Sequence, residues 1–185
     1  MPERRARVRI RRSGELGGIA GHDTDDNAVE YWKIAKGKNA LKSLSSEQRK
    51  HLVKDVLDGV TIGDDVKVVL DVLTTADGSM KETIDSVSWR RVWKKLWGDD
   101  CRTFIRACGR TYWSAASYEE KRAEVKWLAD GRTNDIAQET IIIILRTCTS
   151  AEVSRLDKEV GGWLGLSFDL TGAWDDEFKK MKSGK

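Results

Sequence analysis

The amino-acid sequence predicts an all-α protein. Its only proline is Pro2, near the start of the 185-residue chain, and clusters of turn-forming residues are scarce, which favours helices. Apolar residues recur at helical spacing, as at Leu52, Val53, Val56 and Leu57. The chain also nearly repeats itself, which is typical of architectures that stack one structural unit on another.

The repeat is visible when Glu47 is aligned with Glu119, an offset of 119 − 47 = 72 residues. After a two-residue insertion, Trp89 aligns with Trp163 (163 − 89 = 74). Features shared by both copies should serve the fold, and features of one copy are candidates for function. Identical residues under the two offsets include Val53 and Val125, Lys54 and Lys126, Asp58 and Asp130, Gly59 and Gly131, Thr61 and Thr133, Leu73 and Leu145, Thr75 and Thr147, Asp85 and Asp157, Leu96 and Leu170, Gly98 and Gly172, and Phe104 and Phe178.

The chain divides into four predicted segments. Residues 1–22 form a flexible Arg/Gly-rich arm, because a stretch that repels itself and has little to bury does not fold alone. Residues 23–44 contain a leading helix, which ends at Gly37, and a linker. Residues 45–116 form helical repeat 1 and residues 117–185 form helical repeat 2.

Each repeat is expected to contain about five helices. The first starts at Ser45 or Ser46 and ends at Gly59, a C-terminal cap. The others in repeat 1 are a helix from Val66 to Leu73, helices over 80–87 and 89–97, and a helix around Phe104. In repeat 2 the predicted helices cover about 118–130, 135–147, 149–160, 163–170 and 173–182.

One segment of repeat 2 is ambiguous in its local pattern. The run from Ile141 to Ile144 is β-branched, and such runs favour strands. Its counterpart in repeat 1, residues 68–73, is interrupted by Asp71 at helical spacing. We therefore predict a helix for both segments.

Two stretches resemble the annexin repeat. They run from Asp58-Gly59-Val60-Thr61 through Leu73-Thr74-Thr75 and from Asp130-Gly131-Arg132-Thr133 through Leu145-Arg146-Thr147. They are closer still to the diverged annexin-like repeats of bacterial proteins associated with extracellular contractile injection systems. The resemblance covers roughly residues 45–182 and implies two stacked annexin-like units.

Annexins bind calcium through a Gly-x-Gly-Thr loop and a distant carboxylate, because calcium needs six to eight oxygen ligands. Here the loops read Gly59-Val60-Thr61-Ile62-Gly63 and Gly131-Arg132-Thr133-Asn134-Asp135, and neither contains that motif. Gly59 and Gly131 are better interpreted as helix caps. We expect no cofactor and no metal.

The segment from Trp89 to Trp97 is the most specific candidate for a contact surface. On one helix, Trp89, Trp93 and Trp97 would lie on one side and the cations on the other. The copy in repeat 2 keeps Trp163 and Leu170 but lacks the other tryptophans and all of the cations. The expected partner-binding residues of this segment are Arg90, Arg91, Trp93, Lys94, Lys95 and Trp97.

The N-terminal arm is a second candidate. Within residues 1–12 its six arginines and Glu3 give a charge of +5, so the rest of the chain carries 3 − 5 = −2. Arginine offers a planar fork that suits phosphates. The arm also suits the disordered loading signal that cargo proteins of injection systems commonly carry, as the resemblance implies. Its candidate residues are Arg4, Arg5, Arg7, Arg9, Arg11 and Arg12.

Catalysis has little support in the sequence. The two histidines, His22 and His51, have no evident Ser or Cys partner, and no phosphate-binding loop of the P-loop type occurs. Cys101, Cys108 and Cys148 show no zinc-site spacing and are expected to be reduced thiols. The sequence thus predicts a protein that is not an enzyme.

The leading interpretation is a non-catalytic binding or scaffold module, a cargo or accessory component of a bacterial contractile injection system. It would lie in the bacterial cytoplasm or be loaded into a secreted particle, with a protein partner. One alternative is a peripheral membrane protein that uses the Trp89–Trp97 segment. A second alternative is nucleic-acid binding through the arginine arm.

Overall fold

The computed structural model describes residues 23–59, 61, 63–76, 78–130, 134–160, 166 and 169–184. The predicted N-terminal arm, with its six arginines, lies outside the described residues, as does most of the helix predicted over 163–170.

The described part of the chain is helical and contains no strand, which confirms the all-α prediction. The run from Ile141 to Ile144 is helical, as its counterpart indicated. The helices are α1 (Asp23–Gly37), the 3-10 helix η1 (Leu41–Ser43), α2 (Ser46–Asp58), α3 (Asp64–Thr74), α4 (Met80–Val87), α5 (Trp89–Lys95), α6 (Gly98–Ser114), α7 (Tyr118–Ala129), α8 (Asp135–Leu145), α9 (Ser150–Val160) and α10 (Ala173–Ser183).

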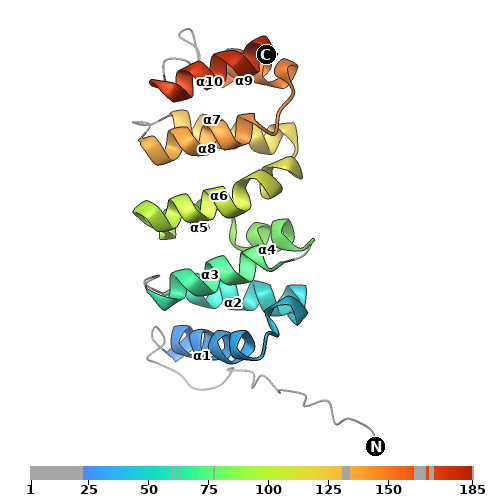
Figure 1. The fold of residues 1–185 in the computed structure, drawn as a ribbon, viewed down its shortest axis with the longest axis vertical. Coiled ribbons are helices and arrows are strands. Elements are labelled where there is room, and N and C mark those ends of the chain that lie inside the picture. The colour runs from blue at the N-terminus through green and yellow to red at the C-terminus, as the bar shows by residue number, and fades with distance from the viewer. Residues whose placement is uncertain are drawn as a thin grey trace, which may run out of the picture.

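The helices stack along one axis, with α1 at one end and α9 and α10 at the other (Figure 1). One row is formed by α3, α6, α8 and α10, each of which contacts the next. In the second row α1 contacts α2, α2 contacts α4, and α7 contacts α9. Contacts of α2 with α3, α4 with α6, α7 with α8 and α9 with α10 join the rows, so helices pair across two layers.

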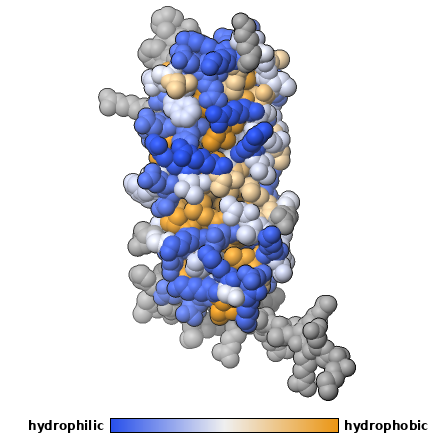
Figure 2. Space-filling view, viewed as in Figure 1, coloured by the Kyte–Doolittle hydropathy of each residue, from blue (hydrophilic) through white to orange (hydrophobic). Residues whose placement is uncertain are grey.

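A single hydrophobic core runs through the whole stack. It extends from Trp32 in α1 to Phe178 in α10 and includes buried residues from every described α-helix. The fully buried side chains include Phe104, Ile141 and Leu166. The visible outer face is mainly hydrophilic, with apolar areas between the helical layers (Figure 2). Burial of apolar area therefore holds the layers together.

Several positions 72 residues apart make equivalent interactions. Ser45 and Ser117 (117 − 45 = 72) each form a capping box, with Gln48 and Glu120 respectively. This reciprocal pair of hydrogen bonds satisfies backbone groups at the start of a helix. It explains why the predicted starts of these two helices agree with the structure.

A buried cation occupies another such pair of positions. Arg49 is 2% exposed, and its guanidinium donates to the backbone oxygens of Leu41, Leu44 and Val72, at 2.9, 3.2 and 2.9 Å. At the equivalent position (121 − 49 = 72), Lys121 donates to the oxygen of Thr147 at 3.0 Å. Each cation thus binds a carbonyl at the C-terminal end of a packed helix, where positive charge is favourable.

The predicted helix over 89–97 is too long. Helix α5 ends at Lys95, because Leu96 is extended (φ −90°, ψ 140°) and Gly98 has a positive φ of 49°. Trp97 is the residue before α6 and does not lie on α5 with the other two tryptophans. The predicted helices over 118–130 and 135–147 end one and two residues earlier, at Ala129 and Leu145.

The tightest packing described at a glycine is between α6 and α8. A Cβ added to Gly109 would lie 2.9 Å from Cγ2 of Ile143 and 3.6 Å from Cη2 of Trp89. The Ile143 methyl group sits on a stiff β-branched carbon, so it has little freedom to move aside. A residue without a side chain is therefore needed where the two helices cross.

Gly109→Ala should lower the free energy of unfolding by about 1 kcal/mol. The overpacking at Ile143, about 1–3 kcal/mol, outweighs the higher helix propensity of alanine, about 1 kcal/mol. Urea denaturation followed by circular dichroism measures the change. Gly37→Ala is the control, since no atom lies within 4 Å of a Cβ there. A stabilised Gly109→Ala variant would contradict the packing argument.

Arg49→Met should lower the free energy of unfolding by about 3 kcal/mol, because several buried carbonyls lose a charged donor together. Lys121→Met should cost less, since Lys121 makes one such bond. Thermal unfolding of both variants against the wild type provides the comparison. If both variants lost equally little stability, water would be satisfying the carbonyl oxygens in place of the cations.

Candidate functional site

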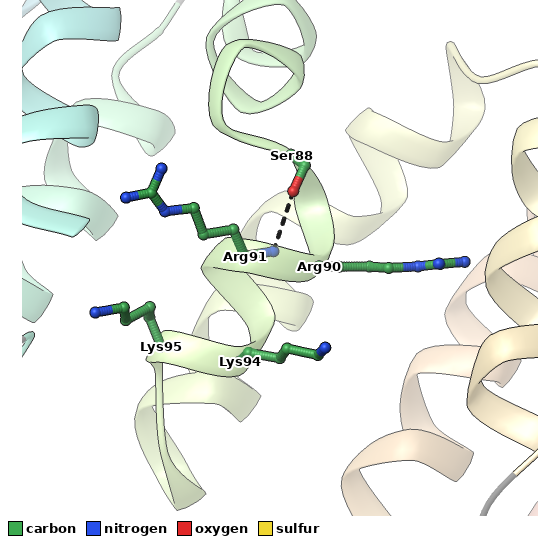
Figure 3. A pocket seen from close by; sticks show the side chains of 5 residues that line it. All are labelled: Ser88, Arg90, Arg91, Lys94 and Lys95. Carbon is green, nitrogen blue, oxygen red and sulfur yellow. Dashed lines mark hydrogen bonds between the residues drawn. The ribbon is translucent and has the colours of Figure 1, made fainter. Parts of the chain in front are cut away.

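Helix α5 crosses the middle of the stack and contacts α2, α4 and α6. It starts after Ser88, a non-glycine residue with a positive φ of 71°, whose hydroxyl accepts a hydrogen bond from the Arg91 N–H at 3.3 Å. Trp89 and Val92 are buried in the core. The apolar side of α5 is therefore used for packing, and its four basic side chains project to two opposite sides of the helix (Figure 3).

The three tryptophans predicted to lie together have different environments. Trp89 is 3% exposed and its ring lies 4.5 Å from that of Phe104. Trp93 is half-buried, donates to Oγ1 of Thr140 at 3.2 Å and packs edge-on against Trp127. Trp97 is 79% exposed. Of the three, the geometry leaves only Trp97 for a partner.

Three of the four cations on α5 have partners within the chain. Arg90 bonds Oε2 of Glu124 at 2.7 Å and the Ala123 oxygen at 2.8 Å. Arg91 pairs with Asp58. Lys95 donates to the Gly59 oxygen at 2.6 Å. The side chains thus connect α5 to the end of α2 on one side and to α7 on the other.

Lys94 differs from these three cations. Its Nζ lies 5.2 Å from the centre of the Trp127 ring, a cation–π contact. The side chain is exposed and forms no ion pair within the described part of the chain. Among the predicted site residues that the structure describes, Lys94 and Trp97 are therefore the most available to a partner.

The outer face of α5 is hollowed. A depression of about 380 Å³ is lined by Ser88 and the four cations, Arg90, Arg91, Lys94 and Lys95. In Figure 3, Arg90 and Lys94 point to one side of the helix, and Arg91 and Lys95 point to the other. The four predicted cations thus line one trough, with their charged ends directed to opposite sides of α5.

The ionic partner of Arg90 was not anticipated from the sequence. Glu124 is 4% exposed, and its Oε1 makes no hydrogen bond. Burial raises the pKa of this carboxyl group, although Arg90 opposes the shift. The internal alignment does carry a signal for it, because Glu124 aligns with Leu52 and Arg90 with Leu164. Each member of the charged pair therefore aligns with a leucine in the copy to which it does not belong.

Among the described residues there is neither a metal-binding cluster nor a readily ionised thiol at Cys101 or Cys108. No group of three or more His, Cys, Asp or Glu side chains is placed to hold a metal ion among them. Burial raises the pKa of Cys101 and of Cys108 to about 12, so neither thiol ionises near neutral pH. None of the described helices combines the length and apolarity needed to cross a lipid bilayer.

Comparison of the chain with family models, with curated proteins and with solved structures gave no match. The chemistry of the described residues and the internal alignment are therefore what bear on function.

Glu124→Gln should leave the protein at least as stable as the wild type at pH 7. The folded-state pKa of Glu124 is raised, so its contribution to stability is full below its unfolded-state pKa and is lost as pH rises through the folded value. The free energy of unfolding of the variant should therefore increase relative to that of the wild type as pH rises from 4 to 7. Urea denaturation across this range measures the difference.

Glu120→Gln, on the same helix, is the control, because the pKa of Glu120 is shifted in the direction opposite to that of Glu124. Hydrogen bonds from Lys81 and Ser117 lower the pKa of Glu120 to about 2. Its stabilisation is present above the unfolded-state pKa and is lost as pH falls towards 2. This variant should be less stable than the wild type at pH 7. The same sign for both variants would contradict the assigned environments.

Proposed function

We propose that the chain is a non-catalytic binding scaffold, built from two copies of a helical unit, that contacts a protein partner through Trp97. The observation that supports this most directly is a comparison of two corners of the chain. Leu96 and Leu170 are both buried, and Gly98 and Gly172 both have positive φ, at 49° and 54°. The residue between them is Trp97 in one corner and a different residue in the other.

In the second corner this residue, Thr171, bonds within the chain. Its N–H and hydroxyl groups contact Oε1 of Gln138, at 2.9 and 3.1 Å. In the first corner Trp97 makes no side-chain capping bond and is 79% exposed. The same backbone turn is thus formed without a tryptophan, so packing does not require the Trp97 indole.

An exposed tryptophan suits protein recognition. Tryptophan is enriched among the few residues that dominate binding energy at interfaces. Among the described residues, the only large apolar side chains that are exposed are those of Trp97 and Ile34. Lys94, three residues before Trp97, adds a charge without an ion pair in the described chain, so we infer a partner with an apolar pocket and an acidic rim.

The geometry gives less support to the membrane alternative. A helix that lies in a membrane surface needs an apolar face directed outwards. The apolar side of α5 is directed inwards, with Trp89 buried and Trp93 half-buried. The single exposed indole of Trp97 offers little area for insertion.

The annexin-like arrangement and the role in a contractile injection system remain proposals that rest on the sequence resemblance. Their support from the residues is the set of equivalent interactions 72 positions apart, at Ser45 and Ser117 and at Arg49 and Lys121. Contractile particles purified from the cells that encode the chain should contain it at a fixed ratio to sheath and tube proteins. Particles that lack the chain would contradict this role.

Trp97→Thr should weaken association with such particles at least tenfold, because the loss of a central aromatic contact costs about 2 kcal/mol or more. The variant places in the first corner the residue type found in the second. Quantitative sedimentation of tagged chain with purified particles measures the effect.

Ile34→Thr is the matched control, since Ile34 is 54% exposed and lies on α1 at one end of the stack. Both variants should keep the thermal midpoint of the wild type. Association that is unchanged by Trp97→Thr, or equally reduced by Ile34→Thr, would exclude Trp97 as the contact.

A further inference from the structure

The trough on the outer face of α5 has the chemistry of an anion site. Its lining consists of Ser88 and the four cations, with no acidic residue. Arg90 and Lys94 form one row and Arg91 and Lys95 the other, each pair four residues apart and therefore on one side of the helix (Figure 3). An anion lying along α5 would be flanked by positive charge on both sides.

The positive charge of this trough is only partly neutralised by the contacts of the described residues. Arg90 contacts the carboxylate of Glu124, and Arg91 contacts that of Asp58. Lys95 contacts a backbone oxygen, and Lys94 contacts the face of an indole ring. Four cations thus contact two carboxylates, which leaves 4 − 2 = 2 positive charges without an anionic partner in these contacts.

The same contacts hold the cations in place. Arg90 is fixed against α7, and Arg91 and Lys95 are fixed against the end of α2. Side chains that are already ordered lose less conformational entropy when a ligand binds. The trough is therefore preorganised for an anion.

We propose that this trough binds a compact, soluble anion with several phosphate groups, such as a polyphosphate or the phosphate chain of a nucleotide. Guanidinium groups match phosphate oxygens in a two-pronged geometry, and lysines supply additional charge. The Ser88 hydroxyl accepts from the backbone and keeps its own proton to donate. The volume of about 380 Å³ lies within the range of small-molecule sites, roughly 300–1,000 Å³.

Two observations favour this assignment over a purely structural role and over a lipid. The aligned positions in the other copy are Leu164, Gly165, Phe168 and Asp169, so the internal alignment does not repeat the four cations. The apolar side of α5 is buried in the core, which leaves no apolar face beside the trough to enter a bilayer. This inference does not depend on the partner contact at Trp97.

Isothermal titration calorimetry with sodium tripolyphosphate tests the proposal on the full chain. The wild type should bind at low ionic strength and more weakly as salt is added, because the attraction is screened. Lys94→Gln together with Lys95→Gln should weaken binding at least tenfold. Lys94→Gln alone should weaken it severalfold, and it keeps the test valid if the double variant unfolds, since Lys94 makes no hydrogen bond in the described chain.

The matched control is Lys38→Gln together with Lys180→Gln. It removes two positive charges, as the test variant does, but at the two ends of the stack. Its affinity should stay within twofold of the wild type. Absence of binding by the wild type, or an equal loss in the control, would overturn the proposal.

A second arm distinguishes a free anion from a lipid headgroup. Vesicles that contain phosphatidylinositol bisphosphate should not carry the wild type upwards in a flotation gradient. Flotation that tripolyphosphate fails to compete away would show that the source of the phosphates is a membrane, and would overturn the assignment to a soluble anion.

Discussion

The structure depends on one constraint, which is that both rows of helices bury their apolar sides in a single shared core. The crossing of α6 and α8 shows how narrow the tolerance is, because Gly109 leaves no room for a methyl group against Ile143. Helix α6 also contacts α5, and the Trp89 ring reaches the same glycine. The position of α5, and hence of every candidate contact residue, follows from this packing.

The buried side chains of α5 fix its position in the core. Its polar side chains then connect it to the neighbouring helices in the middle of the stack. Arg91 and Lys95 bind the end of α2, where helix carbonyls and Asp58 attract positive charge. Arg90 binds Glu124 on α7, and in the internal alignment each of these two residues corresponds to a leucine. A charged pair adds little net stability over apolar packing, so its presence here indicates a requirement other than stability.

The sequence predicted where the described helices occur, but not every helix end and not the environments of the polar residues. Capping chemistry and apolar spacing are local, so the start of α2 and both ends of α4 agree with the prediction. The end of α5 was missed because the spacing of Trp89, Trp93 and Trp97 continues the helical period beyond Leu96, where the backbone becomes extended. The partners of the α5 cations lie more than thirty residues away in the chain, and local patterns carry no information on such distances.

The internal alignment nevertheless separates residues that maintain the fold from residues that are free to act. Where both copies use the same chemistry, as at Arg49 and Lys121, the interaction is buried and directed at backbone carbonyls. Where the copies differ on α5 and at the following corner, the extra groups in the first copy, Lys94 and Trp97, are exposed. Such a side chain is present in the first copy and absent from the second, and it contributes little to the core. Packing therefore does not explain its presence. For Trp97, which is 79% exposed, this favours the proposal that its contribution comes from contacts outside the chain. Lys94 combines such exposure with a cation–π contact to Trp127, so the proposal assigns it the weaker part.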